Sequence, residues 1–216
     1  MTHEIIQAES RGWLASNPAA VGSSVITSLP DLSELSALGF EGWRDWFVAA
    51  ARDVLRWVPP PGVAIFYQSD IRHEGVWIDK GYLLMEAAQA EGTHLIWHKI
   101  VCRKPPGTLG LGRPSYSHLL CFASQLPAAT RRLSPDVLPD AGEAQWTRGM
   151  GVAAGRLACE YLRDETDTRI VVDPFCGRGS VLAVAAEVGF DVLGVELHAK
   201  RCRAARTAIS RALAGG

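Results

Sequence analysis

The sequence predicts an α/β fold in which seven strands form one mostly parallel sheet between layers of helices. Short apolar runs of strand length alternate with longer segments that repeat apolar residues at helical spacing, a pattern typical of doubly wound sheets. Residues 169–196 run through a strand, a glycine turn, a helix and a second strand in close succession. Two further strand-like runs, 94–101 and 116–122, are joined by a loop rich in glycine and proline, which suits an antiparallel pair.

The first half of the chain is expected to hold three of the strands. Its strongest helical pattern covers residues 42–57, where Trp43, Trp46 and Phe47 begin an apolar series with a spacing of three and four residues. Pro59-Pro-Pro-Gly62 ends this helix, because proline cannot continue the ladder of hydrogen bonds. The expected strands are residues 3–8, 25–27 and 63–67, the other helices are residues 11–15 and 80–90, and residues 31–38 are expected to be irregular.

The second half begins with the antiparallel pair and ends with the glycine unit. Residues 128–142 contain several prolines and are expected to form a loop. The elements that follow are a helix over residues 151–162, strands over 169–173 and 191–195 with a helix from about Ser180 between them, and a C-terminal helix. No internal repeat or domain boundary interrupts the pattern, so residues 1–216 are expected to form one domain.

Composition excludes several classes of protein. The 216 residues are 48% hydrophobic, yet no apolar run is long enough to cross a bilayer, and the N-terminus lacks the apolar core of a signal peptide. We therefore expect a cytoplasmic protein with no membrane partner. The five cysteines form no C-x-x-C pair, and His94 and His98 have no third ligand nearby in the sequence, so neither a disulfide framework nor a metal site is expected.

The charge is balanced overall but unevenly distributed. The net charge of −1 argues against a strongly basic nucleic-acid binder. Basic residues nevertheless cluster in the C-terminal helix, and Arg103, Lys104 and Arg113 flank the loop between the paired strands. These clusters could contact phosphates or be ordinary solvated surfaces, and the sequence leaves both open.

The glycine unit predicts a site for a cofactor that contains a nucleoside. Gly177 and Gly179 allow a sharp turn and a close approach of the backbone to a ligand, while the helix that follows directs its free amides at the same place. Glu196, at the end of the second strand, stands where an acid accepts hydrogen bonds from ribose hydroxyls. A dinucleotide fingerprint needs a third glycine where this chain has Leu182, so NAD is disfavoured.

The motif Asp173-Pro-Phe-Cys-Gly-Arg-Gly-Ser180, with Gly194-Val-Glu196 on the next strand, resembles the S-adenosylmethionine site of methyltransferases that modify amino groups of nucleic-acid bases. The resemblance is greatest to the circularly permuted members, in which this motif lies near the C-terminus. It implies a Rossmann-like class I methyltransferase fold in which the first strand lies beside the last, and the strands 94–101 and 116–122 form the terminal antiparallel hairpin. The alternative is an ordinary β-α-β unit with a tight turn.

The resemblance also implies the roles of individual residues. Glu196 would hold the ribose, and Glu9 would meet the adenine amine, although Glu9 could equally be a charge at the start of a helix. Thr147 and Gly149 stand where permuted members carry a further cofactor segment, but the Lys-Pro pair that ends the family segment is missing here. The remaining expected cofactor residues are Asp173, Pro174, Phe175, Cys176, Gly177, Gly179 and Ser180.

The expected catalytic segment departs from the family pattern. Family members carry an acid, asparagine or serine, then two prolines and an aromatic residue, whereas this chain has Ser28-Leu29-Pro30-Asp31. Ser28 and the carbonyl of Leu29 can still accept hydrogen bonds from a substrate amine, but Asp31 cannot stack on a base. Asp31 could contact a polar edge of the substrate, remove a proton, or cap the following segment. We take Ser28, Pro30 and Asp31 as the catalytic candidates.

Substrate contacts are expected after the third strand, at the edge of the sheet where α/β proteins bind ligands. The candidates are Tyr67, Asp70, Trp77, Asp79, Lys80 and Arg113. The sequence thus predicts an S-adenosylmethionine-dependent methyltransferase for a nucleic-acid base, with RNA, such as a tRNA, preferred to DNA because the irregular segments leave little room for a target-recognition region. A small-molecule or protein methyltransferase and a catalytically silent subunit of a heterodimer are the alternatives, and assembly as a homodimer or a heterodimer is left open.

Overall fold

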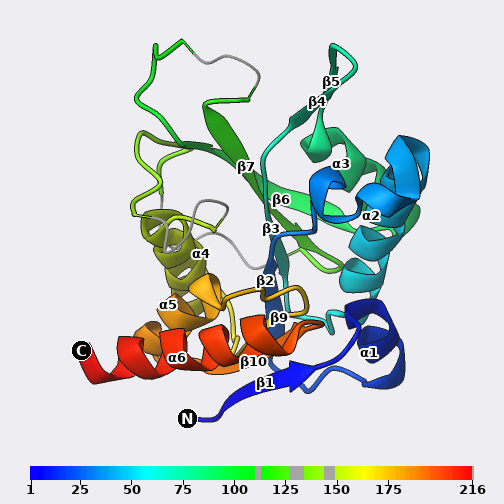
Figure 1. Ribbon diagram of the computed structural model, residues 1–216. Coiled ribbons are helices and arrows are strands. Elements are labelled where there is room, and N and C mark those ends of the chain that lie inside the picture. The colour runs from blue at the N-terminus through cyan, green and yellow to red at the C-terminus, as the bar shows by residue number, and fades with distance from the viewer. Residues whose placement is uncertain (110–112, 127–133, 144–148, 216) are drawn as a thin grey trace.

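The computed structural model describes residues 1–109, 113–126, 134–143 and 149–215. Within them, an eight-stranded sheet runs through the molecule in the order β1-β10-β9-β2-β3-β7-β6-β8, and a separate two-stranded hairpin projects from it (Figure 1). The strands are β1 (His3–Gln7), β2 (Ser23–Thr27), β3 (Ala64–Gln68), β4 (Ile71–His73), β5 (Val76–Ile78), β6 (His94–Cys102), β7 (Tyr116–Ala123), β8 (Val137–Leu138), β9 (Ile170–Asp173) and β10 (Asp191–Glu196). The helices are α1 (Ser10–Ser16), α2 (Gly39–Trp57), α3 (Lys80–Ala90), α4 (Val152–Glu165), α5 (Ser180–Val188) and α6 (Ala199–Gly215), with short 3₁₀ turns η1 (Leu32–Glu34) and η2 (Ser36–Leu38).

The two ends of the chain meet in the sheet. β1 pairs in parallel with β10, so that Ile5 lies opposite Gly194, and β10 pairs in parallel with β9. β9 is followed in the sheet by β2 and β3, also in parallel. β7 is antiparallel to both β3 and β6, as expected for the hairpin. The expectation that the first strand lies beside the last is confirmed.

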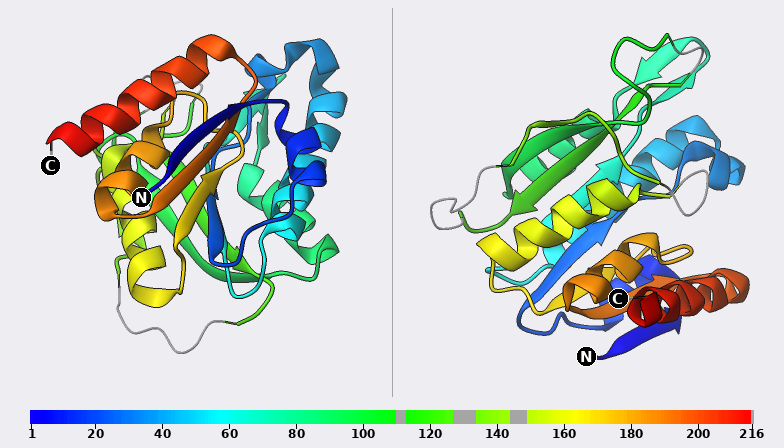
Figure 2. Two further views of the ribbon diagram at one scale, coloured as in Figure 1. Left: turned by 90° about the horizontal axis from the view of Figure 1, so that it is seen from below. Right: turned by 90° about the vertical axis from the view of Figure 1, so that its left-hand side faces the viewer.

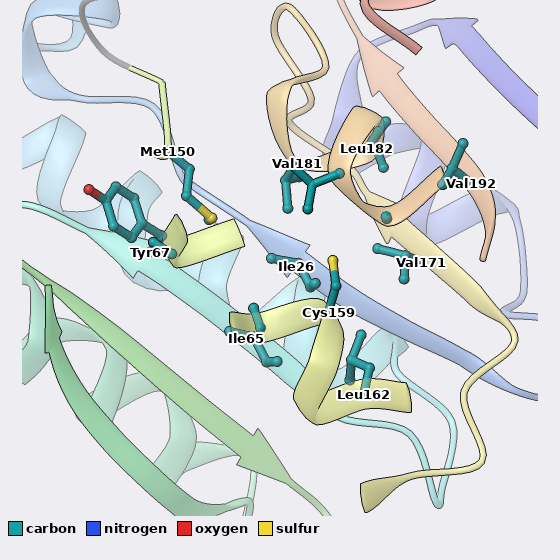
Figure 3. Close-up of a cluster of buried hydrophobic side chains, with 14 of the residues drawn as sticks. Ile26, Ile65, Tyr67, Met150, Cys159, Leu162, Val171, Val181, Leu182 and Val192 are labelled. Carbon is teal, nitrogen blue, oxygen red and sulfur yellow. The ribbon is translucent and has the colours of Figure 1, made fainter. Parts of the chain in front are cut away.

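Helices cover both faces of the sheet, with α4, α5 and α6 on one face and α1, α2 and α3 on the other (Figure 2). The central strands β2 and β3 are buried along their whole length, which explains why their sequences show no alternation of apolar and polar residues. On the first face, Ile26 and Ile65 of these strands pack against Cys159 and Leu162 of α4 (Figure 3). This packing holds the carboxyl ends of the parallel strands in a fixed row.

The sheet has one more strand than the seven that the sequence predicts. Val137–Leu138 pairs in parallel with β6 and forms the outer edge, so the expectation of a loop over the whole of residues 128–142 is wrong at these two residues. The hairpin of β4 and β5 was also not expected. Two- and three-residue strands are too short to show a period of two, and their pairing is decided by tertiary contacts.

Among the described residues, no helix is both long and apolar enough to span a membrane.

Candidate active site

Several expected site residues gather at one edge of the sheet, because they lie at or just after the carboxyl ends of parallel strands. Ser28 follows β2, Asp70 follows β3, and Asp173 and Glu196 end β9 and β10. Glu9 comes shortly after β1, whose last residue Gln7 lies opposite Glu196. Residues far apart in the sequence thus meet at the ends of neighbouring strands.

The turn between β9 and α5 needs glycine. Gly177 and Gly179 have φ of +53° and +77°, in the left-handed region that residues with a side chain rarely adopt. A Cβ at Gly179 would lie 2.8 Å from the Cβ of Ala205 in α6, so the turn packs too closely against α6 for any side chain. Gly177 and Ser180 line a cavity beside the turn, and the first turn of α5 therefore faces this cavity.

The donor groups of this turn fit a polar ligand. The hydroxyl oxygen of Ser180 is buried and has no hydrogen-bond partner within the described ranges. Phe175 and Cys176 line the same cavity, whereas Pro174 and Gly179 are buried in the turn itself. An orphaned hydroxyl beside the start of a helix is a group that a bound ligand would satisfy.

Two buried acids lie on the floor of the cavity. Asp173 Oδ1 accepts hydrogen bonds from Thr27 Oγ1 (2.6 Å) and from the backbone amide of Phe175 (3.0 Å). Burial nevertheless raises the pKa of the Asp173 carboxyl to about 7, because the charged form loses its hydration. Glu196 Oε1 accepts a hydrogen bond from the amide of His198 (2.8 Å) and is 6% exposed. Both carboxylates are therefore placed to meet hydrogen-bond donors or cations.

The cavity has a volume of about 820 Å³, and residues 28–30 and 33–38 form part of its wall. Glu9 lines it, and the carboxylate of Glu9 also caps α1 by accepting from the amides of Arg11 (3.0 Å) and Gly12 (2.7 Å). Glu9 is thus the N-cap of α1, as the sequence allowed, and it also lies at the wall of the cavity. Gly149 lines the cavity too, whereas Thr147 lies outside the described residues.

A smaller cavity of about 420 Å³ adjoins the first. The two cavities share one wall, formed by Ser28, Leu29, Ser33, Glu34, Ser36 and Gly149. Ser28 is exposed and lies at the junction. The carbonyl of Leu29 accepts a hydrogen bond from Gln68 Nε2 (3.4 Å), and the carbonyl of Pro30 accepts one from Trp43 Nε1 (3.2 Å), which anchors the segment to the core. The larger cavity thus opens onto the smaller one at a hydroxyl and a carbonyl.

Asp31 has two partners in the smaller cavity. Its Oδ1 accepts from the amide of Leu32 (2.8 Å), which caps η1, and also lies 3.2 Å from the Nζ of Lys80. Lys80 is 2% exposed, and its ammonium lies over the rings of Trp43 and Phe47. Burial lowers the pKa of Lys80 against the opposing attraction of Asp31. Asp31, which stands where the sequence resemblance implies an aromatic residue, is therefore held by a buried lysine.

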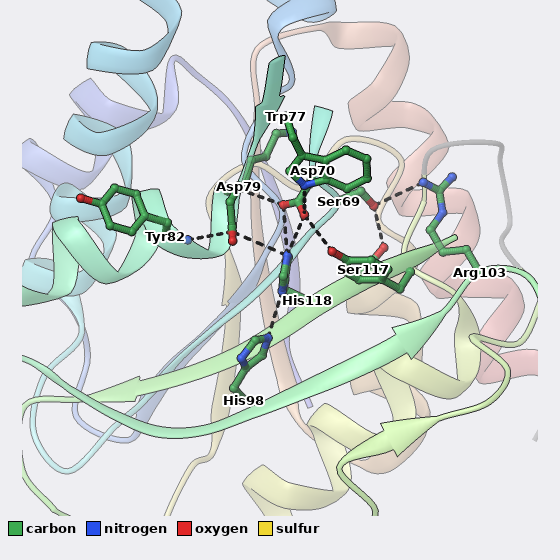
Figure 4. Close-up of polar contacts among 11 residues, drawn as sticks. Ser69, Asp70, Trp77, Asp79, Tyr82, His98, Arg103, Ser117 and His118 are labelled. Carbon is green, nitrogen blue, oxygen red and sulfur yellow. Dashed lines mark hydrogen bonds and ion pairs between the residues drawn. The ribbon is translucent and has the colours of Figure 1, made fainter. Parts of the chain in front are cut away.

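Asp70 anchors a second polar cluster beside this cavity (Figure 4). Its carboxylate accepts from Trp77 Nε1 (3.1 Å), from the backbone amide of Lys80 (2.9 Å) and from Tyr116 Oη (3.3 Å), and it pairs with His118 Nε2 (3.0 Å). Burial would raise the pKa of Asp70, but the hydrogen bonds from His118 and Lys80 outweigh it and lower the pKa. Asp70, Asp79 and His118 could together hold a metal ion by position, yet the oxygens of Asp70 are already used by these donors.

The expected substrate residues are only partly brought together. Tyr67, Asp70, Lys80 and Arg113 line the smaller cavity. Trp77 and Asp79 are not among the lining residues. Trp77 donates a hydrogen bond to the lining residue Asp70, and Asp79 caps α3 by accepting from the amide of Tyr82 (2.9 Å). Asp79 is thus a helix cap in this structure rather than a cavity residue.

Sequence reasoning missed several residues of the site. Trp46, which its helical spacing favoured as a core residue over a stacking platform, lines the larger cavity and meets Phe175 edge to face at 5.9 Å. Arg201 of α6 lies 3.9 Å from Glu196 and 3.6 Å from Glu34, and so connects the two sides of the larger cavity. Glu34, which lines both cavities, was also missed, and its signal was the pattern Asp31-x-x-Glu34, which is that of a capping box and is observed as one.

Comparisons with known proteins show the fold. No protein-family model matches the chain, and no curated protein sequence matches it. Solved structures do match over almost the full length. One is the complex of TTHA0409 of Thermus thermophilus with S-adenosyl-L-methionine, a protein for which a DNA modification methylase function has been suggested. Its sequence is 23% identical to this chain, and the match covers 100% of this chain and 96% of that one with a TM-score of 0.75.

Two other similar structures are more distant in sequence. PvuII DNA methyltransferase, which is cytosine-N4-specific, is 16% identical, with 100% and 94% of the two chains covered and a TM-score of 0.72. The M1.HpyAVI complex with S-adenosylmethionine is 12% identical, with 96% and 100% covered and a TM-score of 0.61. The chain therefore has the fold of these methyltransferases. At these identities the likeness concerns the fold, and the chemistry has to be argued from the site.

Proposed function

We propose that the chain is an S-adenosylmethionine-dependent methyltransferase that modifies a base of a nucleic acid. The observation that carries this proposal is the pair of adjoining cavities: a larger one built from the glycine turn and two buried acids, and a smaller polar one that meets it at Ser28. Methyl transfer needs a cofactor and a nucleophile in line within a site shielded from bulk water. Two cavities with one shared wall meet this need.

We further propose that the fold is a circular permutation of the class I methyltransferase fold. The strand that ends in the glycine turn is β9, which lies between β10 and β2, and β1 lies on the other side of β10. In the family as usually ordered, the cofactor strand opens the chain. Here the N-terminal strand completes the half of the sheet that β9 and β10 begin, which supports the permuted order.

S-adenosylmethionine would supply an activated methyl group, and the residues of the larger cavity suit its parts. Asp173 would meet the ammonium of the methionine moiety, since a cation offsets the cost of burying its carboxylate. Glu196 would accept hydrogen bonds from the ribose hydroxyls, and Glu9 would face the adenine end. The orphaned Ser180 hydroxyl would find its partner in the same ligand.

The wall between the cavities would orient the nucleophile. Ser28 Oγ and the Leu29 carbonyl would accept the protons of a substrate amine and direct its lone pair towards the larger cavity. Gln68 already donates to one lone pair of that carbonyl, which fixes its direction. Asp31, held by Lys80, would accept a hydrogen bond from another edge of the base in place of the stacking ring.

DNA is the substrate to test first. The expectation of RNA rested on a lack of room for a target-recognition region, but the hairpin β4–β5 adds a projecting segment beside the smaller cavity. The similar proteins TTHA0409 and PvuII methyltransferase are described as DNA methylases, a suggested one and an established one respectively. These observations favour DNA and leave the preference for RNA without support.

A second candidate is a silent subunit that binds the cofactor and serves a catalytic partner. It is favoured by Asp31, whose Oδ1 already accepts from the Leu32 amide and from Lys80 Nζ. The two candidate functions differ in whether the purified chain alone catalyses methyl transfer.

The proposal is tested by incubating the purified chain with tritiated S-adenosylmethionine and, separately, duplex DNA, single-stranded DNA and small RNA, followed by mass spectrometry of the nucleosides. Label in one methylated nucleoside, incorporated more slowly by Ser28→Ala, supports the enzyme. Cofactor binding without label in any nucleic acid would contradict it and favour the silent subunit. A Glu4→Gln variant, altered on the exposed side of β1, serves as the control that should keep full activity.

A further inference from the structure

Two segments project from the same end of the molecule beside the smaller cavity. One is the hairpin β4–β5, and the other is the described part of the loop between β6 and β7 (Figures 1 and 2). They carry Arg72, Trp77, Arg103 and Arg113, which we call the mouth surface. All four residues are exposed, and the three arginines line the cavity. The mouth surface therefore surrounds the entrance by which a substrate would arrive.

Trp77 is exposed and yet held in place. It is 40% exposed, but its indole N–H donates to the carboxylate of Asp70, a residue that is only 3% exposed. The guanidinium of Arg72 lies over its ring, 5.3 Å from the centroid. Figure 4 shows the indole lying above Asp70 with its nitrogen pointing at the carboxylate. An exposed aromatic ring fixed in this way loses little conformational entropy when a ligand covers it.

The arginines of the mouth surface are available for an anion. Arg103 is oriented by a hydrogen bond from its Nη1 to Ser69 Oγ (3.3 Å), and Ser69 is in turn bonded to Ser117 (2.6 Å). In the described part of the chain, Arg72, Arg103 and Arg113 form no ion pair within 4.0 Å. Their positive charge is therefore not neutralised internally.

The acids near this entrance are mostly committed elsewhere. Asp70 accepts from several donors, Asp31 pairs with Lys80, and Glu34 lies 3.6 Å from Arg201. Asp79 caps α3, and Glu74 at the tip of the hairpin lies 4.0 Å from His73. The arginines of the mouth surface are therefore cavity-lining charges that remain open to a bound anion, although the whole chain carries a net charge of −1.

We propose that the mouth surface binds the strand of polynucleotide on either side of the nucleotide whose base enters the smaller cavity. The arginines would contact phosphates, and the exposed edge of Trp77 would pack against a neighbouring base. Guanidinium groups combined with a rigid aromatic ring match the alternation of phosphate and base along a strand, and stacking on the ring needs no particular sequence. This inference rests on the proposed function and names the surface through which the substrate is held.

The test measures binding of fluorescein-labelled 20-nucleotide single-stranded DNA, duplex DNA and RNA by anisotropy at several salt concentrations, with S-adenosylhomocysteine present. The double variant Arg103→Gln, Arg113→Gln should lower the slope of log K against log salt by about 1.4 to 1.8, because each lost phosphate contact removes about 0.7 to 0.9. Trp77→Leu should weaken binding at least about fivefold, while Trp77→Phe, which keeps a ring, should retain most of it.

The matched control is Arg203→Gln, which removes the same charge from the exposed face of α6. An equal loss of slope in this control would show that only general charge attracts the strand, and would overturn the proposal. Unchanged S-adenosylhomocysteine affinity in every variant verifies that the fold is intact.

The two proposals fail in different ways. Methyl transfer to a nucleic acid with no change of slope in the double variant would overturn the mouth surface alone. Failure to bind any of the three nucleic acids and to transfer label would overturn both.

Discussion

Replacing Asp173 by asparagine should stabilise the free protein and weaken its binding of S-adenosylmethionine. The carboxyl is buried, and its pKa is raised from 3.8 to about 7. An acid with a raised pKa contributes its full stability below the pKa of the unfolded chain and loses it as the pH rises through the folded value. The wild-type protein therefore becomes less stable between pH 3.8 and about 7 on account of this group.

The size of the effect follows from the two pKa values. Each pH unit in this window corresponds to about 1.4 kcal/mol, so the cost of the buried carboxylate reaches up to about 4 kcal/mol at pH 8. Asparagine keeps an oxygen that can accept from Thr27 Oγ1 and from the Phe175 amide, and it does not ionise. Asp173→Asn should then be more stable than the wild type by up to about 4 kcal/mol at pH 8, and by about 1.5 kcal/mol at pH 5.

Cofactor binding should change in the opposite direction. A charge-assisted hydrogen bond to a cation contributes about 1.5–3 kcal/mol, so the variant should bind S-adenosylmethionine roughly tenfold to 150-fold more weakly. In the wild type, affinity should rise as the pH rises through about 7, because the carboxyl must ionise to meet the ammonium group. Urea unfolding at both pH values and calorimetric titration of the cofactor measure the two effects.

Asp191→Asn is the matched control. The backbone amide of Thr2 lowers the pKa of this exposed carboxyl. Its ionised form therefore stabilises the folded protein above the unfolded pKa, which is the reverse of the effect of Asp173. The control should lose stability at pH 8 and bind cofactor as the wild type does. Equal cofactor affinity in Asp173→Asn and the wild type would refute the assignment of Asp173, and an unstabilised variant at pH 8 would refute the argument from burial.

Three further predictions concern the acids and the shared wall. Glu196→Gln should raise the Kd for S-adenosylmethionine about tenfold, because hydrogen bonds to a charged acceptor are the stronger ones; calorimetry measures it, and an unchanged Kd would remove Glu196 from the ribose site. Ser28→Ala should lower kcat about tenfold to 100-fold with the same cofactor Kd, since the lost acceptor acts on the substrate amine. A single-turnover rate constant equal to that of the wild type would exclude Ser28 from catalysis. Lys80→Met should change the free energy of unfolding by less than about 1.5 kcal/mol, because the partly exposed Asp31 stays hydrated after it loses its partner, but it should raise KM for the nucleic acid. Urea unfolding measures the change in stability. A loss of stability above about 3 kcal/mol would mean that the ion pair chiefly stabilises the fold.

The sequence predicted the long elements because their signals are local. Residues 80–90 repeat apolar side chains over almost three turns, and the helix has these bounds in the structure. The glycine turn was predictable for the same reason, since its two positive φ angles need glycine whatever lies around it. The place of β1 beside β10 followed from the order of strands that the family resemblance implies.

The polar partners of the site could not be predicted in this way. Lys80 and Asp31 are 49 residues apart, and nothing local marks Lys80 as a buried lysine in a helix that starts at the surface. Asp79 is a second example: its position in the sequence suggested a substrate contact, and in the structure its carboxylate caps the start of α3. Such outcomes depend on which donors the folded chain brings to each acid, and that is decided by tertiary packing.

A crystal structure of the protein with S-adenosylmethionine bound would test the central claim most directly. We predict that the ligand occupies the larger cavity, with its ribose at Glu196, its ammonium at Asp173 and its methyl group directed at the junction beside Ser28. A ligand bound elsewhere, or one whose methyl group points away from the smaller cavity, would contradict the proposal that the two cavities form one methyltransferase site.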